Sequence, residues 1–176
     1  MNLDQIRSHF PALSLTDAGQ PRLYLDNPGG TQVAQQVIDP TVSSLTRTNA
    51  NGGGAFRSSR ESDEILDDEH AAMADLLGAQ SPNEIVFGQN MTALTFHMSR
   101  TLGQQFKAGQ EIVVTRMDHD ANISPWLLLA RDLDLTIRWL PFDKETFRYD
   151  LDVYRDLLSE KTALVALNYA SNALGT

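Results

Sequence analysis

Cysteine is absent from the 176 residues of this chain. Its absence excludes a disulfide scaffold and any zinc or iron–sulfur site with cysteine ligands within these residues. No apolar run approaches the ~18 residues that span a membrane, and residues 1–20 lack the apolar stretch of a signal peptide. We therefore expect a cytoplasmic protein that does not use a membrane as a partner.

Positive charge is scarce, since 14 lysines and arginines stand against 23 aspartates and glutamates, for a net charge of −9. So acidic a chain is poorly suited to binding nucleic acid over a broad face, although backbone N–H groups can still bind one phosphate. The composition, 41% hydrophobic and 21% charged, argues against disorder, collagen and coiled coil. The length corresponds to about one globular domain.

The first 78 residues predict helices separated by loops. The expected elements are, in order, a helix over 3–10, a strand over 22–25, a turn over 26–30, a helix over 33–48, a flexible loop over 49–54, and a helix over 58–77 that ends at Gly78. Pro40 is expected in the first turn of its helix or at a kink. The last helix has an apolar face made by Ile65, Ala72, Met73, Leu76 and Leu77. Its acidic stretch, 63–70, is interpreted as a solvated face rather than a metal site.

From residue 84 onwards, strands alternate with helices. The predicted strands are 84–87, 111–115, 135–140 and 163–168, and the predicted helices are 91–106, 125–133 and 151–159. Ser124 and Pro125 suit the N-cap and the first position of the second of these helices. Such alternation is typical of βαβ units, so we predict an α/β fold with a parallel sheet.

The loop 88–93 joins a predicted strand to a predicted helix, a place where ligands bind in open α/β sheets. Asn90 can cap this helix and leave the N–H groups of Met91, Thr92 and Ala93 free. Together with the helix dipole and the Thr92 hydroxyl, these donors make a small phosphate cradle. The alternative for this loop by itself is a capped helix that binds nothing.

The loops 118–122 and 169–176 also follow predicted strands. His119 can act as an acid or base, bind a metal or stack on a flat ligand, or else lie in a plain surface loop. Asn172 can hydrogen-bond a ligand at the mouth of the sheet, or else hold its own turn. A phosphate cradle, an imidazole and an amide in combination suit pyridoxal phosphate (PLP).

Four segments resemble the class V aminotransferases, in particular the cysteine desulfurase-like branch of the fold-type I PLP enzymes. They read YLDNPGGTQ at 24–32, FGQNMTALTF at 87–96, MDHDANISPW at 117–126 and ALNYASNALGT at 166–176. They occur in the family's order, and the resemblance covers the whole chain. It implies a truncated PLP-dependent transferase fold, with a mostly parallel sheet and helices on both faces. Residues 1–25 would be the N-terminal arm of the small domain, and residues 26–176 the first part of the PLP-binding large domain.

The resemblance also assigns residues to the cofactor site. Thr92 and the Met91 N–H would hold the PLP phosphate, although relatives have Gly-Thr where this chain has Asn90 and Met91. His119 would stack on the pyridine ring and assist proton transfer, which makes it the catalytic candidate. Asn172 would hydrogen-bond the phenolic oxygen. The resemblance implies no metal.

Three further residues are assigned to the substrate side by the same resemblance. Gly29 and Gly30 would lie near the substrate, in a segment where the family's Ala-Ala-Thr pattern is altered. Arg57 lies near the loop that relatives direct toward a partner subunit's active site. Because relatives are homodimers, a homodimer is expected for the complete protein.

Two groups that PLP chemistry needs are missing from these residues. In the family, the Schiff-base lysine and the aspartate that holds the pyridinium proton both follow the segment matched at 166–176. The three lysines, Lys107, Lys144 and Lys161, stand in other contexts that are typical of solvated surface positions. This piece of chain is therefore expected not to perform the chemistry alone.

The resemblance further predicts an incomplete sheet. Strands 111–115 and 135–140 would lie side by side, whereas 84–87 and 163–168 would be separated from their neighbours by strands outside this chain. Because unpaired parallel edges are costly, we expect that residues 1–176 do not form a stable native fold alone. The remainder would be a second chain, a cleaved piece or the continuation of a truncated one.

The sequence thus predicts the N-terminal part of a PLP-dependent enzyme acting on a small-molecule amino acid, by Cβ–S or Cβ–Se cleavage, transamination or epimerisation. A nucleotide-binding domain is disfavoured because G-x-G-x-x-G and G-x-x-x-x-G-K-[ST] are absent, and a hydrolase because G-x-S-x-G is absent. The remaining alternative is an inactive PLP-fold fragment that serves as a binding or assembly module. The missing lysine and aspartate would favour that alternative if residue 176 were the natural end of the protein.

Overall fold

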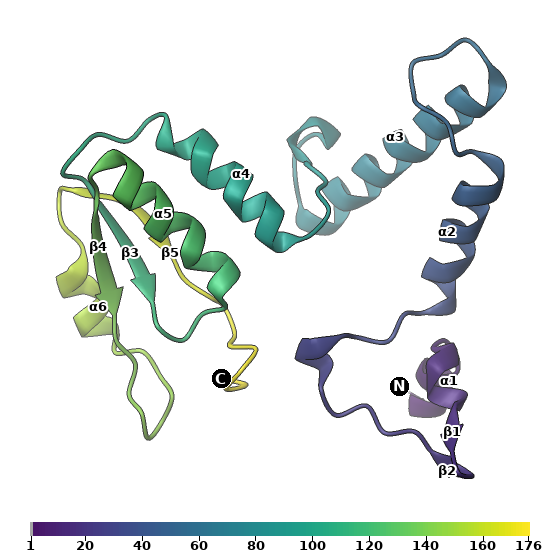
Figure 1. Cartoon of the computed structure of the whole chain (residues 1–176), viewed down its shortest axis with the longest axis horizontal. Coiled ribbons are helices and arrows are strands. Elements are labelled where there is room, and N and C mark those ends of the chain that lie inside the picture. Colours follow the sequence, from purple (N-terminus) through teal and green to yellow (C-terminus); the bar gives the residue numbers. More distant parts are fainter. Residues whose placement is uncertain (1) are drawn as a thin grey trace. The chain divides into compact units, whose positions relative to one another are not determined.

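The computed structural model describes residues 2–176 and divides into two compact units, residues 1–86 and 87–176 (Figure 1). The first unit contains, in order, α1 (Leu3–Ser8), a 3-10 turn (Pro11–Ser14), β1 (Thr16–Asp17), β2 (Gln20–Pro21), a 3-10 turn (Asn27–Gly29), α2 (Gln35–Arg47), α3 (Arg57–Leu77) and a 3-10 turn (Pro82–Glu84). The second contains α4 (Met91–Gly103), β3 (Glu111–Thr115), a 3-10 turn (Asp120–Asn122), α5 (Ser124–Leu133), β4 (Thr136–Leu140), α6 (Leu151–Leu157) and β5 (Thr162–Ala166).

Two predicted strands of the N-terminal half are wrong. Residues 22–25 form no strand, and the antiparallel pairing lies just before them, between β1 and β2. Arg22 closes that hairpin with two hydrogen bonds to the Asp17 carboxylate, at 2.7 and 2.9 Å. Residues 84–87 also form no strand. Neither segment has a neighbouring strand within residues 2–176, so neither can form the ladder that defines a strand.

The helix predicted over 33–48 is confirmed as α2, whereas the placement of Pro40 in the first turn of this helix is wrong. The helix continues through Pro40, which lies beyond its first turn. Proline lacks an N–H, so one helical hydrogen bond is lost at this point. The hydroxyl of Thr41, the residue after Pro40, donates to the Val37 carbonyl at 2.8 Å.

The helix predicted over 58–77 is confirmed as α3, and Gly78 ends it with a left-handed φ of 69°. The apolar face predicted for this helix is not buried, since Leu76 and Leu77 are 75% and 67% exposed. Only Ser59 and Ala74 of α3 are buried. Within residues 2–86, therefore, α3 has no substantial hydrophobic core to cover.

The loop over 49–54 was expected to be flexible, but α3 holds it by hydrogen bonds. Ser59 is fully buried, and its hydroxyl accepts from the Gly54 N–H at 2.7 Å and donates to the Asn51 carbonyl at 2.6 Å. Asp63 accepts from the Gly53 N–H at 2.9 Å. The backbone freedom of glycine is used here for a fixed turn, because Gly53 has a φ of +78°.

The second unit contains a three-stranded parallel sheet in the order β4-β3-β5. The parallel sheet and its strands at 111–115, 135–140 and 163–168 are confirmed to within two residues at each end. The expected separation of 163–168 from its neighbour is wrong, because β5 pairs directly with β3. All five residues of β3 are buried, which suits a central strand with a neighbour on each side.

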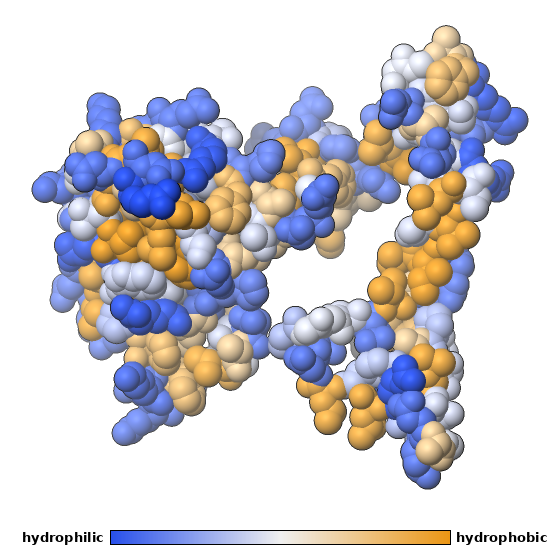
Figure 2. Space-filling view, in the orientation of Figure 1, coloured by the Kyte–Doolittle hydropathy of each residue, from blue (hydrophilic) through white to orange (hydrophobic). Residues whose placement is uncertain are grey.

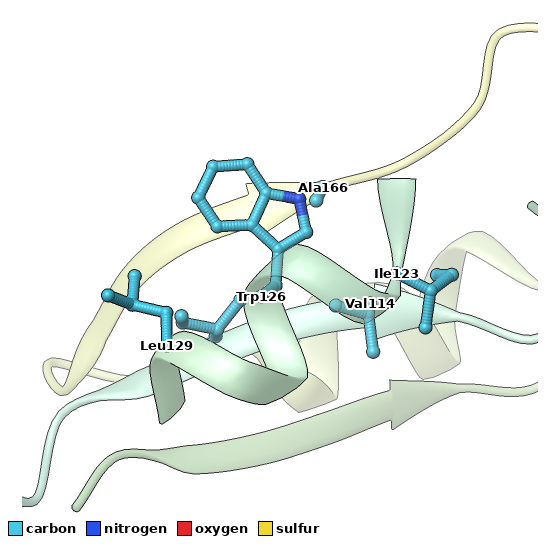
Figure 3. Close-up of a cluster of buried hydrophobic side chains, with 6 residues drawn as sticks. Val114, Ile123, Trp126, Leu129 and Ala166 are labelled. Carbon is cyan, nitrogen blue, oxygen red and sulfur yellow. The ribbon is translucent and has the colours of Figure 1, made fainter. Parts of the chain in front are cut away.

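The hydrophobic core of the second unit lies between this sheet and α5. Val114 of β3 packs with Trp126 and Leu129 of α5 and with Ala166 of β5, and all four are at most 7% exposed (Figure 3). On the other face of the sheet Val113 is fully buried, and α6 packs against β4. Helices therefore cover both faces of the sheet, as predicted. Burial of each large apolar side chain contributes about 1.5–3 kcal/mol to the free energy of folding.

Helix α5 starts differently from the prediction. Ser124 is not an N-cap but the first helical residue, and no side chain caps this end. The Ser124 hydroxyl donates instead to the Asp120 carboxylate at 2.8 Å. Throughout residues 2–176, no helix is both long and apolar enough to cross a membrane.

Candidate functional site

A cavity of about 550 Å³ lies beyond the carboxyl ends of β3 and β5, beside the start of α4. Its lining includes Met91, Thr92, Asp118, His119, Asn168 and Asn172. This is where an open parallel sheet binds ligands. The structure thus brings together the four residues that the sequence assigned to the cofactor, namely Met91, Thr92, His119 and Asn172.

The N-terminus of α4 offers two backbone donors to this cavity. The Asn90 side chain caps the helix by accepting from the Ala93 N–H at 2.9 Å, and the Leu94 N–H donates to the Asn90 carbonyl at 3.1 Å. Ala93 is therefore not a free donor, contrary to the expectation. The N–H groups of Met91 and Thr92 have no acceptor among residues 2–176. These two donors and the positive end of the helix dipole suit an anion.

His119 is held in one tautomer by its own loop. Its Nδ1 accepts a hydrogen bond from the Ala121 N–H at 3.0 Å. A ring nitrogen that accepts carries no proton, so the imidazole proton is on Nε2. The His119 backbone N–H donates to the Asp118 carboxylate at 2.7 Å, which fixes the start of the same turn.

A chain of side chains connects this loop to the hydrophobic core. The Asn122 amide donates to the second oxygen of Asp118 at 2.7 Å, and its carbonyl accepts from the Trp126 indole N–H at 3.2 Å. Trp126 is only 3% exposed. Sequence reasoning missed the role of Asn122. The spacing of Asp118, Asn122 and Trp126 at four-residue steps, which brings side chains together on a helical turn, was the available signal.

The turn after β5 is held by Ser171 rather than by Asn172. The Ser171 hydroxyl donates to the Met117 carbonyl at 3.1 Å and accepts from the Leu174 N–H at 3.2 Å. Ser171 is 5% exposed, so these bonds are shielded from water. The Asn172 side chain makes no hydrogen bond within residues 2–176, which leaves its amide available at the cavity.

Asn168 is a further lining residue that sequence reasoning missed. Its Oδ1 accepts from the hydroxyl of Tyr149, which also contacts the Thr115 side chain. Burial raises the pKa of the Tyr149 phenol, the hydrogen bond from Thr115 lowers it, and the charge of Asp118 raises it again. Asn168 and Tyr149 are 19 positions apart, so no local pattern could indicate this pair.

The substrate-side residues Gly29, Gly30 and Arg57 belong to the first unit. The Gly29 N–H donates to the Asp26 carboxylate at 3.3 Å, and a Cβ at Gly29 would lie 2.6 Å from that carboxylate. Arg57 is 83% exposed and pairs with Glu61 at 2.6 Å, which raises the pKa of the guanidinium. Within residues 2–176, the hydrogen-bond and ion-pair partners of these three residues are Asp26, Asn27 and Glu61 of the same unit.

The three lysines are exposed, and none lines the cavity. Within residues 2–176, no group of three or more histidine, aspartate or glutamate side chains is arranged to hold a metal ion. The cavity therefore offers hydrogen-bond donors, an imidazole and amides, and no lysine among residues 2–176 lines it.

Comparisons with known proteins show the family that the chain resembles. The family model described as Aminotransferase class-V matches residues 23–176. The chain is 34% identical over 180 residues to the "Aminotransferase-like protein FGM3" of Gibberella zeae and 33% identical over 176 residues to a cysteine desulfurase of Yersinia pestis, and each match covers 99% of this chain and 43% of the relative. The apo structure of a cysteine desulfurase from Thermococcus onnurineus NA1 is 27% identical with a TM-score of 0.86, over 99% of this chain and 42% of that one. The chain thus spans about two fifths of the length of these relatives.

Proposed function

The chain belongs to the class V aminotransferase family and has part of the fold-type I architecture of its relatives, and from this premise we propose that it is the N-terminal part of a PLP enzyme that acts on an amino acid. In this proposal, residues 1–25 belong to a small domain and residues 26–176 begin the PLP-binding domain. The family match, which begins at residue 23, supports this division.

The observation that carries the proposal is the convergence of three different groups on one cavity. The N–H groups of Met91 and Thr92 fit a phosphate, the His119 ring fits a flat heterocycle, and the Asn172 amide fits an oxygen anion. Within residues 2–176, the N–H groups of Met91 and Thr92 and the Asn172 amide have no hydrogen-bond partner. In the His119 ring only Nδ1 has a partner, the Ala121 N–H. The residues present therefore fit PLP.

When bound, PLP supplies an electron sink for the bonds at the amino acid's α-carbon. Met91 and Thr92 would hold its phosphate, and Asn172 would hold its phenolic oxygen. His119 would orient its ring by stacking and hold a proton at Nε2. Because the Ala121 N–H occupies Nδ1, His119 can take up another proton only by breaking that bond.

The lysine and the acidic partner of the pyridine nitrogen are proposed to come from outside residues 1–176. The exposure of Lys107, Lys144 and Lys161, and their absence from the cavity lining, support this part of the proposal. The relatives named as cysteine desulfurases favour cysteine as the amino acid, and the aminotransferase-like relative favours amino-group transfer.

The test uses the full-length protein prepared without cofactor. Addition of PLP is expected to give a visible absorbance band that borohydride removes. Alanine formed from L-cysteine would support desulfuration, and amino transfer to a keto acid would support an aminotransferase. Binding of PLP without turnover would support the alternative of a binding or assembly module, and no binding of PLP would contradict the proposal.

Two replacements of His119 distinguish its proposed stacking on the PLP ring from its proposed role in holding a proton. H119F keeps a flat ring, so we expect its PLP dissociation constant to stay near that of the wild type, whereas H119A is expected to weaken binding about 2- to 10-fold. Both variants lose Nε2 and should lose turnover alike. The measurements are a fluorescence titration with PLP and the rate of amino acid consumption. Equal PLP affinity for H119F and H119A would contradict the stacking role.

A further inference from the structure

Asn168 lies between two cavities of the second unit. It lines the 550 Å³ cavity described above and also a neighbouring cavity of about 490 Å³, whose wall includes Tyr149 and Met117. Its side chain is half-buried and immediately follows the sheet, since β5 ends at Ala166. A contact that Asn168 makes in one cavity can therefore fix the orientation of its side chain in the other cavity.

Tyr149 determines which end of the Asn168 amide is free. The Tyr149 hydroxyl donates to Oδ1 of Asn168. An amide has one accepting and one donating end, so this bond leaves the NH₂ group as the available end. No acceptor for that NH₂ group exists within residues 2–176. A half-buried donor without a partner, at the wall of a cavity, is suited to a ligand acceptor.

Thr115 lies close to the Tyr149 hydroxyl. Thr115 is fully buried at the end of β3, and its Oγ1 accepts from the Met117 N–H at 3.2 Å. Burial raises the pKa of the Tyr149 phenol, the nearby Thr115 side chain lowers it, and the charge of Asp118 raises it. The direction of the Tyr149 bond is given by its geometry, in which the hydroxyl donates to Asn168.

We propose that Asn168, oriented by Tyr149, donates a hydrogen bond to an anionic oxygen of the ligand in the 550 Å³ cavity. This inference rests on the proposed function, in which the oxygen belongs either to PLP or to the carboxylate of the amino acid. Asn168 is then a binding residue, and Tyr149 is a positioning residue that acts through it. The sequence motifs assigned a role to neither.

The test uses the full-length protein and three variants. Y149F removes the orienting hydroxyl, and N168D replaces the donor by a negative charge. Y154F is the matched control, because Tyr154 lies in α6 and its hydroxyl makes no hydrogen bond within residues 2–176. Thermal melts identify any variant that fails to fold, and Y149F and N168D report on the role of Asn168 independently of each other.

Two readouts distinguish the source of the oxygen. A fluorescence titration of cofactor-free protein gives the PLP dissociation constant, and steady-state kinetics give KM for the amino acid. We expect Y149F to raise one of these about 3- to 10-fold and N168D to raise the same one further, with Y154F unchanged. An effect on the PLP constant assigns the oxygen to the cofactor, and an effect on KM alone assigns it to the amino acid.

Two outcomes would overturn the inference in different ways. If wild-type protein binds PLP and the Y149F and N168D variants match Y154F in both readouts, the role of Asn168 is wrong and the proposed function stands. If wild-type protein does not bind PLP, the proposed function fails and this inference fails with it.

Discussion

At the scale of single residues, Asn122 stabilises the His119 loop by hydrogen bonds at both ends of its side-chain amide. Its amide donates to Asp118 and its carbonyl accepts from the indole of Trp126. A side chain that satisfies two partly buried groups is costly to remove, because each partner loses its hydrogen bond without regaining water. The site and the core are thus connected through one amide.

We expect N122A to lower the free energy of unfolding by about 1–3 kcal/mol, because the Trp126 N–H and the Asp118 carboxylate both lose a partner. Urea denaturation of the full-length protein, followed by tryptophan fluorescence, measures this change. Asn83 provides the control, since it is exposed and its side chain makes no hydrogen bond within residues 2–176. Equal midpoints for N122A and N83A would show that the link to Trp126 does not stabilise the fold.

At the scale of elements, the start of α4 combines a structural cap with the proposed anion site. The Asn90 side chain satisfies Ala93 and so leaves the two preceding N–H groups for a ligand. A change of charge at residue 90 can distinguish its role as a helix cap from the anion binding proposed for the Met91 and Thr92 N–H groups. An aspartate caps a helix as well as an asparagine does, but it places a negative charge beside the anion.

N90D is therefore expected to keep the stability of the protein while weakening PLP binding about 3- to 10-fold. N90A is expected to lose about 1 kcal/mol of stability with the cap. Titration with pyridoxal, which lacks the phosphate, is the control and should not distinguish N90D from wild type. If N90D weakens pyridoxal and PLP equally, the start of α4 does not hold the phosphate.

The elements also show how far the sequence could predict this fold. Strand β3 was predictable because its apolar, β-branched run is of the kind that a sheet covered on both faces buries, and β4 and β5 because their short, largely apolar runs alternate with helices. The segments 22–25 and 84–87 have similar runs but no neighbour, and strand formation depends on a neighbour. The adjacency of β5 to β3 was not predictable from any local pattern either.

The site was predictable only in part, for the same reason. Met91, Thr92, His119 and Asn172 were found because each lies in a recognisable motif, and the structure gathers them at one cavity. Their roles toward PLP stay predictions. Asn168 and Tyr149 were missed because their contact joins two loops that are distant in the sequence.

At the scale of the whole molecule, the two units differ sharply in burial. Within residues 2–86 the single buried hydrophobic residue is Ala74, whereas the second unit buries β3 completely. Val37, Val42 and Leu45 of α2 are each more than half exposed, and Figure 2 shows apolar atoms along this helix. Such faces are normally covered by further protein.

We therefore expect the 176-residue chain by itself to lack a single cooperative transition. Hydrogen exchange should find the amides of β3 protected and those of α2 and α3 close to unprotected, because little apolar burial stabilises those helices. The same peptides in the full-length protein serve as the comparison. One sharp, monomeric melt of residues 1–176, with equal protection in both units, would contradict this expectation.

The position of β3 at the centre of its sheet has a consequence for synthesis of the chain. Both of its neighbours, β4 and β5, are translated after it. During translation β3 therefore leaves the ribosome with neither edge paired, and its apolar residues stay uncovered until residue 166 has emerged. The start of α4 is made early, but Asn168 and Asn172 come last. A nascent chain can thus gather the full set of cavity groups only after residue 172 has been synthesised.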